Sequence, residues 1–570
     1  MNTLFVLVIA AAALFLGYGW YARGINADVI RPDAKKATPA KMYMDGVDFM
    51  PASRNVLFGY QFKSIAALGP ITGPIVAVAW GWLPALIWII LGTFFIGWVQ
   101  DYGSMMMSVR RDGDTMGALS YKLVSPRARS ILMLFLYFYL LLIMGSFGNL
   151  VGKSLMTRPT VPMGMIILTL MGILAGRMTY KWKRDIILTT VVTVVLSFVG
   201  IWVGTQPAVS NLFAGLFGLP KSPVLFGTVT RAQFLGTVLV LLFCYLGSVL
   251  PIWSWAQPVN YVSFWIIGLG MLGGVAGMLI WRPSMGDFPA FTKWTIGAGP
   301  LWPMLFVTIA CGAISGWHSL VSTSGTARQL ERETDALPVG GGAMFMEMVM
   351  AVISFLTATV AFGSYAAYQE AVKPGALNVF AEGLARFLDH IGVGHTFGVA
   401  YGSVFLTIMG LTIMQLAVRF MRVASAELLG DKVPVFKNVH VGTTVALLLT
   451  ALFVWIIPWL TIWTAFGSAN QLMAGLALLL ISLWLRSEGK RNGWALYPAL
   501  FMLTTTVAAL VLLAINQFKT MGVAKTGEAR TAALLVGLIA VVLLGAAAFL
   551  ILDGYKALRK PVAAPAKKPV

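Results

Sequence analysis

Three ionisable side chains, Asp101, His318 and Glu347, lie within apolar stretches of this sequence. An acid or base at the centre of a bilayer costs roughly 2.5–3.5 kcal/mol on insertion scales, so each of them needs a reason to be there. A buried carboxyl that gains and loses a proton can couple the movement of a solute to a proton gradient, whereas a permanently charged one can bind a cation such as sodium. The residue types therefore indicate ion-coupled transport, and they leave the ion, a proton or sodium, open.

Asp101 is the first candidate for the coupling group. It follows Gln100 near the end of a long apolar run, and Gly97 lies four residues before it on the same face of a helix. Small residues on that face let another helix approach closely and turn the acid toward protein rather than lipid. The alternative is an interfacial acid that pairs with Arg110 or Arg111.

Glu347 is the second candidate, and its surroundings follow the same pattern. Small residues recur on its side of the predicted helix, at Ala343, Ala351, Ser354 and Ala358. An interfacial position is again the alternative. We interpret Glu347 as the group that would carry the proton, or help to bind a cation, if Asp101 does not.

Two short breaks interrupt the apolar runs, and the first extends from Gly69 to Pro74 and includes Thr72. A proline lacks a backbone donor and clashes with the preceding turn, so two prolines this close cannot sit in a regular helix. Freed carbonyls are tolerated in hydrocarbon only where protein, water or a ligand satisfies them, and such discontinuous helices mark the binding sites of transporters. We predict that Gly69, Pro70, Gly73 and Pro74 form a non-helical stretch that lines a cavity. The alternative is a proline kink with a packing role.

The second break extends from Gly312 to Thr326 and contains His318. Hydroxyl side chains surround this histidine in the sequence, at Ser315, Ser319, Ser322, Ser324 and Thr326. They could coordinate a cation or bind a substrate carboxylate, but they could equally cap the ends of a broken helix. A lone histidine is more often a hydrogen-bonded structural residue than a ligand, so the existence of a metal site stays open.

Two further pairs of polar residues belong to apolar runs. Gln415 and Arg419, four residues apart, form part of a polar stripe on the run that ends at Phe420, and Gln415 lies too deep to be a simple anchor. Asn470 and Gln471 end the segment FGSANQ, where two runs join with almost no loop. We count these four as candidates for the substrate or ion pathway; for the second pair, a tight extracellular turn is the alternative.

Composition places the chain among polytopic membrane proteins. It has 570 residues, of which 58% are hydrophobic and 11% are charged, whereas soluble domains carry roughly 25% charged residues. The phosphate-binding motif of ATP-driven pumps and the zinc-protease motif are absent, the two cysteines lie in apolar runs, and four histidines are too few for a haem-based redox machine. We therefore expect no enzymatic activity and no cofactor beyond a coupling ion.

We count about fifteen apolar runs that are long enough to cross a bilayer, within a range of about fourteen to eighteen. Their approximate extents are 3–22, 65–81, 83–106, 131–152, 160–176, 185–204, 232–254, 262–281, 299–320, 343–363, 397–419, 441–463, 470–486, 494–517 and 531–553. The sequence thus predicts one all-α transmembrane domain over residues 1–553, with an N-terminal part of about 3–370 and a C-terminal part of about 371–553. A basic tail over residues 554–570 is predicted to be disordered.

The 41 basic residues exceed the 21 acidic ones and give a formal charge of +20. In a soluble protein this excess would suggest nucleic acid as a partner. Here the basic residues cluster in alternate loops and in the tail, where they set the orientation and meet anionic lipid. We expect an N-terminus outside and a C-terminus in the cytoplasm, with membrane lipids and a small-molecule substrate as partners and no nucleic acid. The oligomeric state does not follow from the sequence.

Six segments are specific when they are read in order: FGYQFKSIAALGPITGPI, GWVQDYGSMMMSVRRDG, SVLPIWSWAQPVNY, CGAISGWHSLVSTSGT, TFGVAYGSVFL and FGSANQLMAGLALL. Together they make residues 3–517 resemble the carbon-starvation (CstA) family of bacterial inner-membrane transporters. The resemblance implies uptake of peptides or pyruvate during carbon limitation, and a LeuT-like fold of the amino acid–polyamine–cation superfamily with extra helices. The chain departs from the family pattern at Tyr60 and Gln61, where a histidine pair is common, and at Gln415, where an aspartate is common.

We therefore predict a secondary transporter that works by alternating access, with a substrate carboxylate facing a half-helix N-terminus at one of the breaks. A membrane sensor or structural subunit that binds a nutrient without moving it is one alternative, and a channel is another. Mid-membrane breaks and buried acids favour transport. A sensor would usually carry a soluble signalling domain, and the sequence has none.

Overall fold

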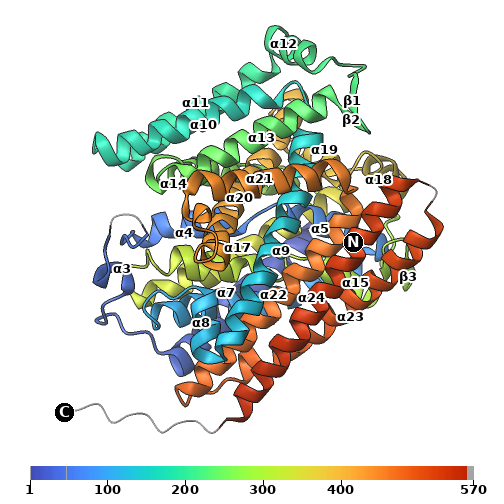
Figure 1. Cartoon of the computed structure of the whole chain (residues 1–570). Coiled ribbons are helices and arrows are strands. Elements are labelled where there is room, and N and C mark those ends of the chain that lie inside the picture. The colour runs from blue at the N-terminus through green and yellow to red at the C-terminus, as the bar shows by residue number, and fades with distance from the viewer. Residues whose placement is uncertain (1, 46–47, 525, 561–570) are drawn as a thin grey trace.

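The computed structural model describes residues 2–45, 48–524 and 526–560, and most of them are helical. Within these residues, thirteen helical segments are long and apolar enough to cross a membrane. The α-helices in these segments are α1 (Thr3–Leu14), α2 (Arg23–Ile25), α6 (Trp82–Gly92), α7 (Trp98–Val109), α9 (Pro126–Leu150), α10 (Val161–Gly176), α11 (Ile186–Thr205), α13 (Arg231–Val249), α14 (Ala256–Trp281), α17 (Gly342–Thr359), α20 (His395–Leu429), α21 (Val439–Ile456), α22 (Trp459–Ser487), α23 (Gly493–Val523) and α24 (Gly527–Arg559). Figure 1 shows α10, α11 and α13 along one edge of the bundle and α23 and α24 at another.

Local chemistry explains where several of these helices begin. Asp185 accepts hydrogen bonds from the first backbone amides of α11, and Thr230 and Gln233 form a reciprocal capping box at the start of α13. Pro126 opens α9, where its missing backbone donor is not needed. Capping side chains thus satisfy the free backbone amides and fix the residues at which these helices begin.

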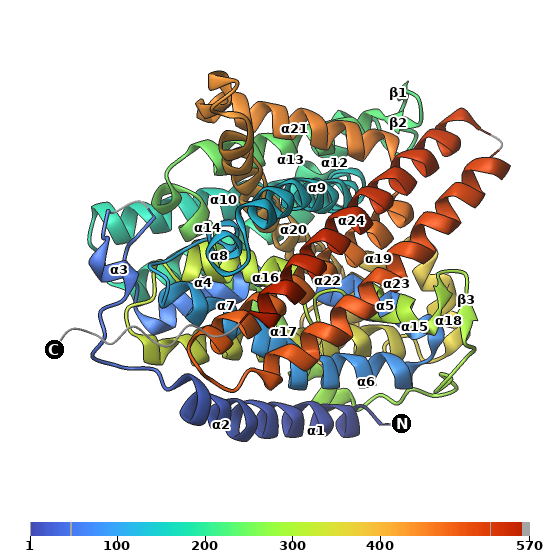
Figure 2. The same cartoon turned by 60° about the horizontal axis from the view of Figure 1, so that its bottom comes forward.

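Two further segments are discontinuous helices. The first consists of α4 (Arg54–Ile65) and α5 (Gly69–Ala77), and the chain bends by 47° at this break. The second consists of α15 (Leu301–Thr308) and α16 (Gly316–Val321), with α16 continuing into a π-helical turn at Ser322–Thr326. Figure 2 shows α5 near α15 and α4 near α16, so the two discontinuous helices run side by side.

The two discontinuous helices contact each other at residues without side chains. A Cβ atom on Gly73 would lie 2.7 Å from the Thr308 carbonyl oxygen, and one on Gly69 would overlap the Cys311 side chain. On the other side of the contact, between α15 and α16, a Cβ on Gly312 would come within 3.4 Å of the Cα of Pro70. Glycine is therefore required at this crossing because the two backbones approach too closely for any side chain.

The remaining elements are short. They are α3 (Pro39–Met42), α8 (Met116–Leu123), α12 (Pro207–Phe217), α18 (Tyr365–Val372), α19 (Ala376–Asp389) and two antiparallel hairpins, β1 (Val224–Phe226) with β2 (Val229–Thr230) and β3 (Thr295–Ile296) with β4 (Gly299–Pro300). Among these, α19 has no counterpart among the expected segments; it is a largely buried helix of 14 residues that packs against α14, α17 and α20. At about 1.5 Å per residue it is too short to cross a bilayer, which is why a search for spans passes over it.

Thirteen of the expected segments correspond to continuous segments that are long and apolar enough to cross a membrane, the run 65–81 corresponds to the bent pair α4 and α5, and the run 299–320 to α15 and α16. By length and composition the described residues therefore hold thirteen or fourteen candidate spans, where about fifteen were expected. The all-α polytopic class and the presence of at least two discontinuous helices are confirmed. Of the predicted tail, residues 554–559 continue α24, and residues 561–570 lie outside the described residues.

The prediction for the first break is wrong in its position. Gly69, Pro70, Gly73 and Pro74 are helical and form the start of α5, while the non-helical residues are 66–68. Pro70 lies in the first turn of α5, where a helix tolerates a missing donor, so this proline begins a helix rather than interrupting one. The stretch is fully buried but does not border the cavity described below.

The segment FGSANQ does not form a turn either. It lies within α22, and the chain turns at Ile457 and Pro458, earlier than the sequence suggests. Pro458 is the residue before α22, and the apolar residues on both sides of it hide the boundary from a hydropathy count. Asn470 and Gln471 therefore lie on a continuous buried helix.

Ion pairs and hydrogen bonds show which helix ends lie together. Arg129 pairs with Glu427 (3.4 Å) and Arg127 with Asp553 (3.6 Å), so the start of α9 lies beside the ends of α20 and α24. We call this end of the bundle, with its loops 110–125, 182–185, 430–438 and 488–492, the basic face. The start of α1 lies at the other end, because Asn2 forms an isolated β-bridge just beyond the far end of α14.

Candidate functional site

His318 lies between the two acids that the sequence singles out. Its Nδ1 is 3.0 Å from Oδ2 of Asp101, and its Nε2 is 3.1 Å from Oε2 of Glu347. None of the three side chains is exposed. We call these residues the His318 triad. Asp101 thus faces a histidine, and the alternative partner Arg110 is engaged by Glu333 at 3.1 Å.

Small residues bring the three elements of the triad together. Asp101 is on α7, His318 on α16 and Glu347 on α17. A Cβ on Gly97 would lie 2.5 Å from the Ala313 carbonyl oxygen, and one on Gly312 would lie 2.5 Å from the Cβ of Ala351. The small residues on the helix faces of Asp101 and Glu347 therefore allow close approach, as the sequence predicts, and the segment that approaches the two acids is the second break.

The two sides of the imidazole differ. Nδ1 of His318 forms a hydrogen bond with the Asp101 carboxylate. Nε2 and both oxygens of Glu347 have no hydrogen-bond partner among the described residues, so the contact on that side is electrostatic. A histidine held by one carboxylate and faced by a second can take up a proton and share it within the triad.

A fourth buried ionisable side chain, Lys63, was not among the sequence candidates. It lies in the last turn of α4 and is not exposed. Its Nζ donates to the Thr412 hydroxyl (2.6 Å) and to the Ala66 carbonyl (3.3 Å), and it interacts electrostatically with Glu347. The available signal was the apolar residues of FGYQFKSI around it, which place Lys63 inside the segment rather than in the preceding polar loop.

Side chains of α7 and α22 satisfy the carbonyls freed by the second break. The hydrogen bonds are from Gln100 Nε2 to Ser315 O (2.8 Å), from Asn470 Nδ2 to Ala310 O (3.0 Å) and from Gln471 Nε2 to Ile309 O (3.2 Å). Unpaired backbone groups are unfavourable in an apolar environment, so these three side-chain amides stabilise the non-helical conformation of the break. Asn470 and Gln471, which the sequence suggests for the substrate or ion pathway, thus bind backbone carbonyls, and Gln100 beside Asp101 does the same.

The hydroxyls of the second break do not gather around one point. Ser319 donates to its own helix, Ser322 and Thr326 bond to Gln61 of α4, and Ser324 faces a cavity. Ser315 donates to Asn470, while the Thr72 hydroxyl of α5 has no partner among the described residues. Within the described part of the chain, no group of three His, Cys, Asp or Glu side chains is placed to hold a metal ion.

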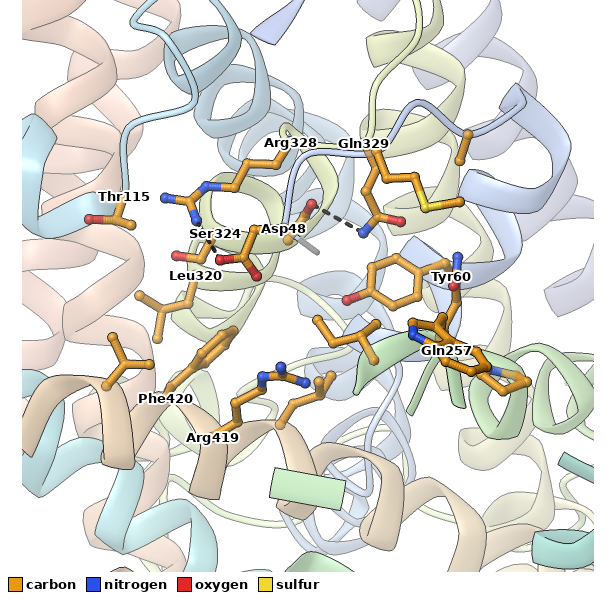
Figure 3. Close-up of a pocket in the computed structure, with 18 of the residues that line it drawn as sticks. Asp48, Tyr60, Thr115, Gln257, Leu320, Ser324, Arg328, Gln329, Arg419 and Phe420 are labelled. Atoms are coloured by element: carbon orange, nitrogen blue, oxygen red, sulfur yellow. Dashed lines mark hydrogen bonds and ion pairs between the residues drawn. The ribbon is translucent and has the colours of Figure 1, made fainter. Parts of the chain in front are cut away.

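A cavity of about 560 Å³ begins beside the second break and extends toward the basic face. Its lining includes aromatic side chains from several elements: Tyr60, Tyr180, Trp253, Tyr261 and Phe420. Figure 3 shows Arg419 of α20 pointing into the space that Tyr60 and Ser324 face from other elements. The cavity is therefore lined by several elements, among them α4, α9, α14, α20 and the turns after α10 and α16.

Arg419 differs from the other charged side chains on the lining. Arg328 pairs with Asp48 at 3.8 Å, and Arg422 donates to a backbone carbonyl of α13 at 2.7 Å. The buried Nη1 of Arg419 has no hydrogen-bond partner among the described residues. Gln415, one turn before it, does not line the cavity and accepts a hydrogen bond from the Trp255 indole at 3.0 Å.

Two elements connect the cavity to the buried charges. Leu320 and Ser324 border the cavity and follow His318 on the same half-helix, while Tyr60 borders it one turn before Lys63. A shift of α16 or α4 would therefore change the cavity lining and the position of a buried charge at the same time. A solute in the cavity would lie next to the elements that carry the ionisable groups without touching those groups.

Comparison with known proteins gives one consistent result. The model of the family described as carbon starvation protein CstA matches residues 2–373 and 363–509. The peptide transporter CstA of Escherichia coli is 28% identical, over 89% of this chain and 81% of that protein, and that of Campylobacter jejuni is 29% identical, over 89% and 80%. The pyruvate/proton symporter BtsT of Escherichia coli is 30% identical, over 63% of this chain and 49% of its own length.

Solved structures with a similar course of the chain are more distant. The crystal structure of MhsT in complex with L-phenylalanine is 13% identical and covers 88% of this chain and 99% of its own, with a TM-score of 0.46. A manganese transporter from Eremococcus coleocola is 14% identical, with a TM-score of 0.37.

Proposed function

Because the chain belongs to the carbon starvation protein CstA family, we propose that this transmembrane transporter is a secondary active carrier that imports a small nutrient by alternating access and uses a proton gradient. The observation that carries the proposal is the His318 triad, which is buried where a discontinuous helix meets α7 and α17. Ionisable groups at such a position are costly, and they mark substrate or ion pathways and proton relays.

The charges of the site support a proton rather than a sodium ion. With a proton on His318, the two carboxylates of Asp101 and Glu347 are balanced by the imidazolium and by Lys63. Without it, one buried negative charge is left uncompensated, and this is unfavourable in a low-dielectric environment. The site should therefore release its proton only in a state where water or a rearranged neighbour compensates the charge, which ties proton movement to the conformational change.

We propose a short peptide, or another small carboxylate, as the substrate, with its carboxylate held by Arg419. A guanidinium with a free N–H edge binds a carboxylate in a bidentate manner, and the aromatic residues of the lining offer surface to an apolar side chain. The volume of about 560 Å³ falls in the usual range of small-molecule sites, with more room than a three-carbon acid needs. Relatives named for peptides and for pyruvate both fit this chemistry.

For the orientation we propose an extracellular N-terminus and a cytoplasmic C-terminus in a bacterial inner membrane. Positively charged loops stay on the cytoplasmic side, and the basic face carries the clusters Arg110–Arg129 and Arg419–Lys437 as well as the end of α24. The cavity extends toward this face, so the structure would correspond to an inward-facing state of the carrier.

The test is uptake into proteoliposomes of labelled dipeptides and labelled pyruvate, with a proton gradient, a sodium gradient or neither. We expect accumulation with the proton gradient alone. Asp101→Asn should lose this accumulation but keep exchange between compartments loaded equally with substrate, since exchange requires reorientation with substrate and no change of proton load. Asp431→Asn, at an exposed loop position of the basic face, is the control and should behave like the wild type.

Accumulation driven only by sodium would contradict proton coupling. Loss of both accumulation and exchange in Asp101→Asn would assign the aspartate a structural role, and normal accumulation would leave Glu347 as the coupling candidate. Failure of every tested solute to exchange in the wild type would contradict the proposed substrate class.

A further inference from the structure

Lys63 has an environment that resembles a binding site for a monovalent cation. Its ammonium is bound by the carbonyl oxygen of Ala66, which belongs to the non-helical residues of the first break, and by the hydroxyl of Thr412 on α20. No carboxylate oxygen of the described residues lies within ion-pair distance of Nζ, although Glu347 interacts with it electrostatically. The immediate ligands are therefore neutral oxygens from a broken helix and from a neighbouring helix.

Neutral oxygens of this kind are what transporters offer to sodium. Unwound carbonyls and the C-terminal end of a half-helix coordinate the ion, because the helix dipole adds negative potential at that end. Here α4 ends at Ile65, so the ammonium lies at the C-terminal end of a half-helix. The Thr412 hydroxyl donates to the carbonyl of Ile408, which leaves its lone pairs for the cation.

We propose that the Lys63 ammonium is a tethered substitute for a bound monovalent cation, so that the carrier operates without sodium and a cation enters this site only when the lysine is removed. The inference rests on the proposed transport function for its physiological meaning but not for its test. It assigns Lys63 a positioning role: the ammonium fixes the break of α4 to α20, the helix that carries Arg419 at the cavity.

The assignment explains why a charge is tolerated there. A buried ammonium without partners would be strongly unfavourable, and two oxygen ligands, the end of α4 and the nearby Glu347 together compensate it. It also accounts for the balance of the core, in which Lys63 supplies the second positive charge against the two acids. A free ion could leave during the transport cycle, whereas a tethered ammonium group stays attached to the chain.

The experiment compares the full-length wild type with Lys63→Ala and Lys63→Met in sodium, potassium or choline chloride at equal ionic strength. Thermal unfolding of the detergent-purified proteins is one readout, and substrate exchange in proteoliposomes is the other. A ligand that binds only the folded state raises the unfolding temperature in a concentration-dependent way. We expect no difference between the salts for the wild type.

For Lys63→Ala we expect a lower unfolding temperature in choline, which sodium or potassium raises in a saturable manner, and exchange at background level in choline that the same cation restores. Lys63→Met fills the space with an uncharged chain, so no cation should rescue it. Lys153→Ala is the matched control: Lys153 also donates to a helix-terminal carbonyl, that of Val454 at 3.2 Å, and its loss should create no dependence on cations.

Three results would overturn the inference: sodium-dependent stability or exchange of the wild type, full exchange of Lys63→Ala in choline, or an unfolding temperature of Lys63→Ala that no alkali cation changes. The first applies even if the variants fail to fold. A wild type that exchanges no solute would contradict the proposed function, while the unfolding measurements would still decide the role of Lys63.

Discussion

Four acidic or basic side chains with no exposed surface define the charge of the core in the described part of the chain: Asp101, Glu347, His318 and Lys63. They come from four elements, and their charges cancel when the imidazole is protonated. The effect of removing any one of them can therefore be predicted from the net charge that would remain in the core. Loss of a base leaves a surplus of negative charge in the core, and loss of an acid leaves a surplus of positive charge.

His318→Gln should destabilise the protein because it leaves Asp101 and Glu347 without the cation between them. Removal of one partner of a buried ion pair costs about 3–5 kcal/mol. The loss should become smaller as the pH is lowered over the range in which the wild type stays folded, since protonation of a carboxylate then removes the surplus charge. Unfolding temperatures of wild type and variant across this range would measure it, and an unchanged difference would contradict the ionic role. His440→Gln, at an exposed position beside Tyr245, is the control.

At the scale of residues, the sequence identifies the two acids but does not predict that both contact His318. A charge in an apolar run is conspicuous, so Asp101, His318 and Glu347 could be named in advance. Their contacts could not, because 217 positions separate Asp101 from His318 and no local pattern encodes such a pairing. Lys63 escaped notice because the second predicted apolar run begins at residue 65, which leaves the lysine just outside it.

At the scale of elements, the main feature is the crossing of the two discontinuous helices. Their backbones meet at glycine, and amide side chains of α7 and α22 satisfy the freed carbonyls of the second break. The sequence predicted that both helices are interrupted. It could not show that Pro70 starts α5, because a proline in the first turn and a proline in a break look alike without the surrounding contacts.

Gly73→Leu should abolish substrate exchange and leave membrane insertion intact. An added Cβ would lie 2.7 Å from the Thr308 carbonyl oxygen and 3.0 Å from the Cα of Ile309, and both of these are backbone atoms that cannot move aside cheaply. Gly268→Leu on α14 is the control, since open space surrounds that position. Quantification of the variant in isolated membranes separates insertion from transport; normal exchange by Gly73→Leu would show that the crossing tolerates a side chain.

The whole molecule is a bundle whose basic loops share one face. Hydropathy predicted its segments well because lipid requires long apolar helices. The cavity could not be predicted, since its lining joins a loop before α4, the start of α14 and the end of α20, which are far apart in the sequence. The buried α19 was missed because its 14 residues are too few to cross a bilayer, so a search for apolar spans passes over it.

A tag on the C-terminus should be found in the cytoplasm and a tag on the N-terminus outside. The physical reason is the retention of short basic loops on the cytoplasmic side. Accessibility of both tags to an impermeant label in intact cells and in inverted membrane vesicles measures this. A cytoplasmic N-terminus would mean that one of the fifteen assigned segments, the discontinuous α15–α16 above all, does not cross the membrane.

The balance of the four buried charges also has an electrical consequence. If the core gives up and takes up one proton per cycle, a zwitterionic peptide imported with that proton carries one net positive charge across the membrane. A monoanionic acid imported with the same proton carries none. The membrane voltage is worth about 2.3 kcal/mol per charge at 100 mV. It would then drive the uptake of the peptide directly but would not affect the uptake of the acid. Peptide accumulation would therefore persist wherever a voltage remains after the pH difference has collapsed.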